Sequence, residues 1–427
     1  MVPIALFGRL ALAGSLILLP TLAWTQAALT LPEAQRIALS RSQLITAQDA
    51  AAQSAREMAV AAGQLPDPVL KLGVENVPVT GPDRLSLSRD FMTMRRVGVM
   101  QELPRSDKRR LKVERVERDI QRIQAERSQA VATVQRETAL AWIDRYYGQA
   151  TLELLRKQFA ETQLQGQGAE IAYRSGRGSQ GDVFAARAAL AGLRDKLAQT
   201  ERQARSAGLM LARWVGPDAQ HLPLQGPIDW RTSAGADGLA SHLAHLPQLE
   251  QLAAQTAAAE TELRQAQANT RADWTVEATY SQRGSAYSNM VSIGVSIPLQ
   301  LDRANRQDRE VAAKRAALNE AQAKYQDALV SHEAEVRVLL NDWHINKERI
   351  AGLSADLLPA AGQRTDAALT AYRSAKGDLA AVLSARRDEI DARMQILSLE
   401  METARLWAQL AYLIPDTSTL PARGDQP

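Results

Sequence analysis

The chain has 427 residues, a formal net charge of +3 and an apolar fraction of 45%, of which aromatic residues are only a small part at 4%. A charge so near zero gives no bias toward nucleic acid, and alanine and leucine supply most of the apolar surface, which favours close helix packing. The sequence contains no cysteine. We therefore expect no disulfide, no thiol chemistry and no lipid-modified N-terminal cysteine.

Residues 1–27 have the pattern of a secretory signal peptide. Arg9 precedes an apolar run from Leu10 to Leu19, and small residues surround a cleavage position near Ala27. The alternatives are a short membrane anchor or a buried helix, but the run is short for a bilayer span. No later stretch reaches the roughly 18 apolar residues of a membrane helix. A membrane region would therefore have to consist of β-strands in a closed barrel.

The next part of the chain alternates between helical and strand patterns. Helix formers run without an internal break from Leu31 to Gln64 and end at a Pro-Asp-Pro sequence. Two short strands are expected at 68–77 and 95–103, the first with Leu70, Leu72 and Val74 on one face. After Pro104 a charged, alanine-rich pattern predicts one helix of about 68 residues, roughly 100 Å long, to Ala172.

Two similar stretches divide the chain into repeats. Ala-Tyr-Arg-Ser begins at Ala172 and again at Ala371, about 200 residues later, with glycine following in each copy. Each copy is interpreted as the tip of a helical hairpin, and so long a period indicates a duplicated structural half rather than a solenoid. The predicted parts are the first repeat (28–214, with its tip at 173–181), a linker (215–245), the second repeat (246–415, with strands at 274–283 and 290–298 and its tip at 372–378) and a disordered tail (416–427).

Within each repeat, two short helices placed end to end would match one long helix beside them. The predicted fold is therefore mainly α with a small membrane β part and an internal two-fold structural repeat. Four strands can cross an outer membrane but cannot close a barrel. Since an open sheet edge is not tolerated in lipid, three subunits would pool their strands into a 12-stranded barrel above a coiled-coil helical barrel. Such an assembly is a tunnel.

This arrangement resembles the TolC-like outer membrane factor family over the whole mature chain. The segment LLPAAGQRTDAALTAYRSAKGDLAAVLSARRDEIDARMQILSLEMETARLWAQLAYLIP is most similar to the outer membrane subunits of heavy-metal cation efflux systems. The resemblance implies a homotrimer in the outer membrane with a long periplasmic portion. It also implies a periplasmic adaptor (membrane fusion) protein and an inner membrane pump of the RND type as partners.

The resemblance implies two roles for the tips. Adaptor contact falls on two sets of four residues: Gly176, Arg177, Gly178 and Ser179, and Ala375, Lys376, Gly377 and Asp378. The alternative is that both tips are merely solvated turns. A closed-state lock is implied between Tyr372 and Asp182, to which Lys376 could add a charge-assisted contact. Gly377 stands where the best-known members have arginine, and Ala381 and Ser384 stand where they have aspartates, so we expect no acidic gate at that level.

Other chemistry is weakly indicated. His242 and His245 have the spacing of a metal pair but lack a third ligand, and we predict no metal site. Met92, Met94 and Met100 could touch Cu(I) or Ag(I), but are interpreted as ordinary apolar residues of a loop and strand. Alternating charges on the long helix, such as Glu114, Arg115, Glu117 and Arg118, are interpreted as a solvated face. No nucleophile motif or phosphate loop is present, so we expect neither an enzyme nor a cofactor.

The predicted function is the exit duct of a tripartite efflux system that exports heavy-metal cations. The alternatives are the outer membrane component of a multidrug efflux or type I protein secretion system, which the sequence does not distinguish. A soluble periplasmic adaptor fits less well, because it would have one helical hairpin and extensive β domains. A soluble coiled-coil scaffold would lack the paired alternating strands.

Overall fold

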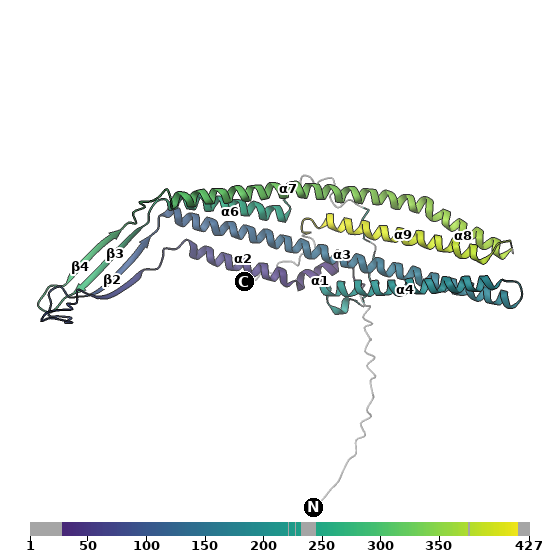
Figure 1. The fold of residues 1–427 in the computed structure, drawn as a ribbon, viewed down its shortest axis with the longest axis horizontal. Helices are drawn as coiled ribbons and strands as arrows, with labels where there is room; N and C mark the ends of the chain where they lie inside the picture. Colours follow the sequence, from purple (N-terminus) through teal and green to yellow (C-terminus); the bar gives the residue numbers. More distant parts are fainter. Residues whose placement is uncertain (1–27, 221, 227, 232–244, 375, 417–427) are drawn as a thin grey trace, which may run out of the picture.

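The protein is a long rod with a β-sheet at one end and two helical hairpins at the other (Figure 1). The computed structural model describes residues 28–416 except 221, 227, 232–244 and 375. The predicted signal peptide (1–27), most of the predicted tail, part of the linker, His242 and Ala375 therefore lie outside the described residues. The mainly α fold with four strands is confirmed.

Both halves of the chain follow one pattern of a helical segment, two strands, a long helical segment and a return helix, although the number of helices differs. In the first half they are α1 (Leu31–Arg41), α2 (Gln43–Ala62), β1 (Val69–Glu75), β2 (Met94–Leu103), α3 (Ser106–Arg174), α4 (Gln180–Val215) and the short 3-10 helix η1 (Pro217–Gln220). In the second half they are α6 (Pro247–Asn269), β3 (Trp274–Gln282), β4 (Met290–Ser296), α7 (Gln307–Gly352), the π-helical turn η4 (Leu353–Leu357), α8 (Leu358–Arg373) and α9 (Leu379–Ala411). The duplication is therefore structural.

The four strands form one antiparallel sheet in the order β1-β2-β3-β4. The strands β2 and β3 join the two halves, with Gly98 opposite Thr279 and Val99 opposite Ala278. A Cβ at Gly98 would lie 2.7 Å from the hydroxyl oxygen of Thr279, so a larger residue there would displace the Thr279 side chain. The outer strands β1 and β4 each have one unpaired edge within the described chain.

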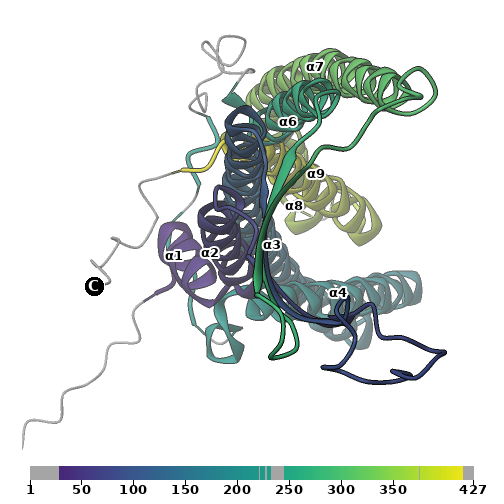
Figure 2. The ribbon, with the colours of Figure 1, turned by 90° about the vertical axis from the view of Figure 1, so that its left-hand side faces the viewer.

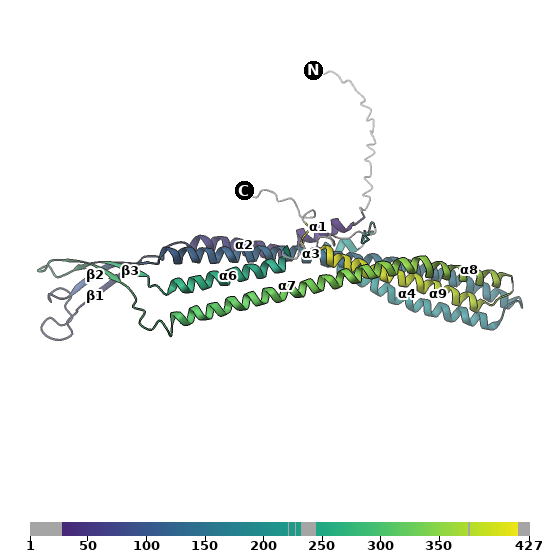
Figure 3. The ribbon, with the colours of Figure 1, turned by 90° about the horizontal axis from the view of Figure 1, so that it is seen from above.

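Short helices are placed end to end along long ones, as predicted (Figures 1 and 3). The helices α2 and α4 lie along α3, and α6 and α9 lie along α7 and α8. The helix α3 is unbroken for 69 residues, about 100 Å at the helical rise. Viewed along the rod, the helices form an arc (Figure 2). No helix in the described part of the chain is both long and apolar enough to span a membrane.

Two predicted continuous helices are interrupted. The first breaks at Ser42, which takes an extended backbone and accepts a bond from the Ile45 N–H, so α2 starts a new helix with its own cap. The second long helix contains the π-helical turn η4 just before Pro359. Proline has no N–H to donate to the preceding turn, and its ring crowds the carbonyl there, which accounts for the wider turn. The prediction of single helices was wrong at both places.

The largest core lies halfway along the rod, where the segment between the repeats packs on both halves. It contains Trp142, Tyr147, Leu211 and Trp230. Three indole N–H groups form hydrogen bonds that join the segments of this region. Trp142 donates to the Leu29 carbonyl, Trp230 to the Tyr147 hydroxyl, and Trp343 to the Trp230 carbonyl. The connecting segment is therefore bonded to both long helices.

Near the sheet, charged side chains join neighbouring helices. Glu262 of α6 accepts a bond from Arg115 of α3 at 2.6 Å and one from Lys314 of α7 at 2.8 Å. Glu114 of α3 pairs with Arg264 of α6. The prediction that Glu114 and Arg115 belong to a merely solvated face was wrong, because helical spacing does not indicate which neighbouring helix a charged side chain meets.

Candidate functional site

The two hairpin tips share one backbone design. The Arg177 N–H donates to the Ala172 carbonyl at 2.9 Å, and the Lys376 N–H donates to the Ala371 carbonyl at the same distance. These bonds satisfy carbonyls at the end of the incoming helix. Among the predicted adaptor contacts, Gly176 has a φ of +72°, which glycine adopts without the strain that other residues meet there. The repeated sequence thus encodes a repeated turn.

The glycine just before the cap of the outgoing helix in each tip lets the turn lie close to the incoming helix. A Cβ on Gly178 would lie 3.0 Å from the Cβ of Ala172, and a Cβ on Gly377 would lie 3.1 Å from the Cβ of Ala371. The next residue in each tip caps the outgoing helix: Ser179 accepts from the Asp182 N–H, and Asp378 accepts from the Ala381 N–H. Gly377, which stands in place of arginine, thus lies in close contact with Ala371. The remaining described tip residues, Arg177 and Lys376, are exposed.

The predicted lock residues have other partners in this chain. Both backbone and side chain of Ser179 donate to the Asp182 carboxylate, at 3.1 and 2.7 Å, in a capping box. Tyr372 is half-buried against an apolar cluster that includes Val183 and Leu379. No hydrogen bond joins Tyr372 to Asp182 in the described structure, and Lys376 has no ion pair there. The lock therefore stays a prediction.

The first turn of α9 contains no acidic residue. Ala381 and Ser384, at the positions predicted to lack a carboxylate, are both exposed. The turn is instead fixed by the apolar cluster of Ala169, Val183, Ala186, Leu379 and Val382, which joins the two hairpins. The sequence analysis did not identify this cluster, because it depends on how two distant helices meet.

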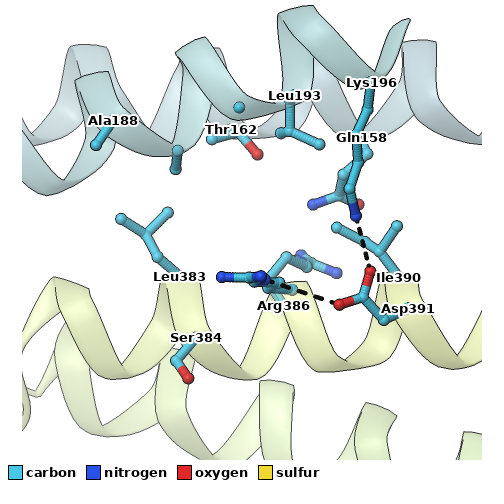
Figure 4. A pocket seen from close by; sticks show the side chains of 13 residues that line it. Gln158, Thr162, Ala188, Leu193, Lys196, Leu383, Ser384, Arg386, Ile390 and Asp391 are labelled. Carbon is cyan, nitrogen blue, oxygen red and sulfur yellow. Dashed lines mark hydrogen bonds and ion pairs between the residues drawn. The ribbon is translucent and has the colours of Figure 1, made fainter. Parts of the chain in front are cut away.

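A groove of about 450 Å³ opens between the hairpins, farther from the tips than this cluster. The helices α3 and α4 form one wall and α9 forms the other (Figure 4). Small residues of α4, including Gly192, leave the space open, and a Cβ on Gly192 would touch nothing within 4 Å. Lys196 of α4 pairs with Asp391 of α9 at 3.0 Å across the groove. The sequence analysis did not predict this groove.

The sheet at the opposite end has two unlike faces. Apolar side chains share one face because cross-strand partners point the same way: Leu72 pairs with Val97, Val97 with Tyr280, and Tyr280 with Val291. Many of them are exposed, including Leu72 at 70% and Ile293 at 78%. Contiguous exposed apolar surface of this kind indicates contact with lipid or protein.

The other face of the sheet is polar. Lys71 pairs with Glu277 at 2.7 Å, and Arg96 pairs with both Glu75 and Glu277. Thr279 accepts a bond from Arg96 at 3.3 Å. Two cations and two anions thus neutralise each other across three strands. This face suits water rather than hydrocarbon.

The structure offers little for a metal or cofactor. Among the described residues, no group of three His, Asp or Glu side chains could hold a metal ion. His245 lies 3.8 Å from Glu250, and its predicted companion His242 is outside the described residues. Met92 lies in the loop before β2, and Met94 and Met100 lie within β2. The predicted absence of a metal site and of a cofactor stays a prediction.

No family model matches this sequence, and no curated protein is similar enough to it to show a relationship. Solved structures do share its fold. VceC, an outer membrane protein of Vibrio cholerae, is 20% identical with a TM-score of 0.73, over 90% of this chain and 95% of VceC. CusC, a protein that forms a transmembrane channel, is 14% identical with a TM-score of 0.76. The match covers 90% of this chain and 92% of CusC.

The open state of the Neisseria gonorrhoeae outer membrane channel MtrE is 15% identical with a TM-score of 0.75, over 90% of this chain and 88% of MtrE. At such identities the comparison shows the fold. The chain has the fold of the TolC-like outer membrane channels, as the sequence predicted. CusC and MtrE are channels and not enzymes.

Proposed function

We propose that this protein is the outer membrane channel of a tripartite efflux system, with the sheet in the membrane and the helices in the periplasm. The observation that supports it most is the sheet, which has an exposed apolar face, a charged face and two unpaired edges. In lipid both edges must be paired. Three chains would achieve this as a 12-stranded barrel with the charged face toward a water-filled lumen.

The strand lengths fit the proposal. The strands have 7 to 10 residues. At about 3.3 Å per residue they cover roughly the 25 Å apolar band of an outer membrane barrel. The helices extend about 100 Å beyond the sheet and end in the two tips, which suits a duct that crosses the periplasm. The exposed tips would meet a periplasmic adaptor, which in turn would connect the duct to an inner membrane RND pump.

A pair of adjacent residues on β4 tests the placement of the sheet. The chain has no cysteine, so single cysteines give a clean background. Ser292→Cys, on the polar face, should react in intact proteoliposomes with a maleimide that does not cross membranes. Ile293→Cys, on the apolar face, should react only after denaturation. Equal reaction of both cysteines in intact vesicles would contradict the proposed barrel.

For the cargo we propose heavy-metal cations, on the resemblance of the segment from Leu357 to Pro415 to metal-efflux subunits. The alternatives are multidrug efflux and type I protein secretion. A deletion strain should become sensitive to copper, silver, zinc, cobalt or cadmium, and the wild-type gene should restore tolerance. Unchanged metal tolerance together with increased antibiotic sensitivity would favour the multidrug alternative.

A further inference from the structure

The groove between α4 and α9 contains polar groups that the described protein does not satisfy. Gln158 of α3 is only 7% exposed, yet its amide Nε2 has no hydrogen-bond partner in the described structure. The Arg386 Nε of α9 is buried in the opposite wall and likewise lacks a partner in the described structure. Both groups can only donate. Because an unsatisfied buried donor is costly, two of them in one groove indicate an acceptor that is not part of this chain.

The residues that line the groove carry a net positive charge and include an apolar set. Among the lining residues, Lys196, Arg386 and Arg387 carry positive charge and Asp391 carries negative charge. Lys196 and Arg387 share Asp391 as their partner, at 3.0 and 3.7 Å. Arg386 lies 3.5 Å from Glu161 and 3.4 Å from Glu389, so its other nitrogens are engaged while its Nε is not. The apolar part of the lining consists mainly of Ala188, Leu193, Leu383 and Ile390.

The size of the groove suits a small-molecule ligand. A volume of about 450 Å³ lies within the roughly 300–1,000 Å³ of small-molecule sites. Figure 4 shows side chains of both hairpins, such as Leu193, Leu383 and Arg386, directed into this space.

We propose that the groove binds a small amphipathic carboxylate. The carboxylate would accept from Gln158 Nε2 and Arg386 Nε near Lys196, and its apolar chain would lie on Leu193, Leu383 and Ile390. Because these residues come from α3, α4 and α9, the ligand would bridge the two hairpins. The site goes beyond the proposed function and does not depend on it, since binding needs neither pump nor adaptor.

Octanoate is a suitable probe, with 1-octanol as the uncharged control. Isothermal titration calorimetry on the full-length protein in amphipol should show saturable binding of octanoate at one site per chain. Octanol should bind at least about tenfold more weakly, because it lacks the charge that strengthens both hydrogen bonds. Equal affinity for the two compounds would overturn the proposal.

Two variants locate the site. Gln158→Leu keeps the approximate volume and removes one donor, so octanoate affinity should fall roughly tenfold. Gly192→Leu should abolish binding, since its side chain enters the groove without a clash. The matched control is Gly168→Leu on α3, where a Cβ also has free space but does not line the groove. Wild-type affinity in both groove variants, or loss in the Gly168 control alone, would refute the assignment.

Discussion

The indole N–H of Trp230 donates to the hydroxyl oxygen of Tyr147 at 3.0 Å, which bonds the segment between the repeats to the first long helix. The carbonyl of Trp230 in turn accepts from Trp343 of the second long helix at 3.0 Å. Burial raises the pKa of Tyr147 further above physiological pH, where its hydroxyl is protonated and can accept this bond through its oxygen. One residue thus connects both halves of the duplicated chain.

Replacing this indole should loosen the middle of the rod. Trp230→Phe keeps an aromatic ring but removes the bond to Tyr147, and should lower the free energy of unfolding by about 1 kcal/mol. The measurement is thermal unfolding followed by circular dichroism in detergent. Trp407→Phe is the control, because Trp407 packs on the same core without a hydrogen bond in the described structure. Equal effects of the two substitutions would mean that the bond contributes nothing.

Glu400 should make stability depend on pH. Burial raises the pKa of its carboxyl, and the opposing charge of Arg231 offsets this only in part. The folded state then holds its proton more tightly than the unfolded state, so stability falls as pH rises from the ordinary value of 4.5 toward the raised pKa. At neutral pH, Glu400→Gln should raise the melting temperature by a few degrees. The same substitution should reduce the loss of stability measured as the pH rises from 4.5. An unchanged dependence of stability on pH would contradict this role of Glu400.

Gly178 and Gly181 are a matched pair at the first tip. A Cβ on Gly178 would press on Ala172, whereas one on Gly181 would make an ordinary 3.5 Å contact with Ser179 Oγ. Gly178→Ala should therefore destabilise the tip by about 1–3 kcal/mol, and Gly181→Ala, inside the helix, should stabilise it by about 0.5–1 kcal/mol. Hydrogen exchange of amides 172–182 measures both. Faster exchange in the Gly181 variant than in the Gly178 variant would reverse the expected order.

The predicted lock between Tyr372 and Asp182 can be tested with a variant that separates it from the helix cap. Tyr372→Phe combined with Asp182→Ala should raise single-channel conductance in planar bilayers by releasing the closed tips. Asp182 also caps α4 through Ser179. Ser179→Ala removes that cap while leaving Asp182 free to meet Tyr372, so this variant should keep the conductance of the wild type. If Ser179→Ala by itself increased the conductance, loss of the helix cap would explain the effect of the double variant, and the lock would not be needed.

Local sequence patterns predicted most of the helices and strands. Alternation in Val291, Ile293 and Val295 predicts β4, and the helical composition after Pro104 predicts α3 to within two residues of each end. The two Ala-Tyr-Arg-Ser copies predict two tips, and the structure gives both the same backbone bonds. These features depend on neighbours in sequence, where the period and the turn residues are decisive.

The sequence analysis missed two local helix interruptions and several contacts between distant residues. The break at Ser42 looks like helix interior until its cap is seen, and Pro359 alone does not distinguish a π-helical turn from a kink. Other features depend on which helix faces lie against each other. They include the pairing of Glu262 with Arg115 and Lys314, and the groove that Gln158 lines. Periodicity along one helix does not fix that arrangement.

Ionic conductance of the purified protein in a planar lipid bilayer tests the central claim most directly. An outer membrane duct predicts discrete, uniform steps, each from one inserted trimer. The contradicting result is the absence of any step at a protein concentration at which liposome flotation shows that the protein has bound to the membrane. In that case the sheet would attach the chain to a surface without forming a channel.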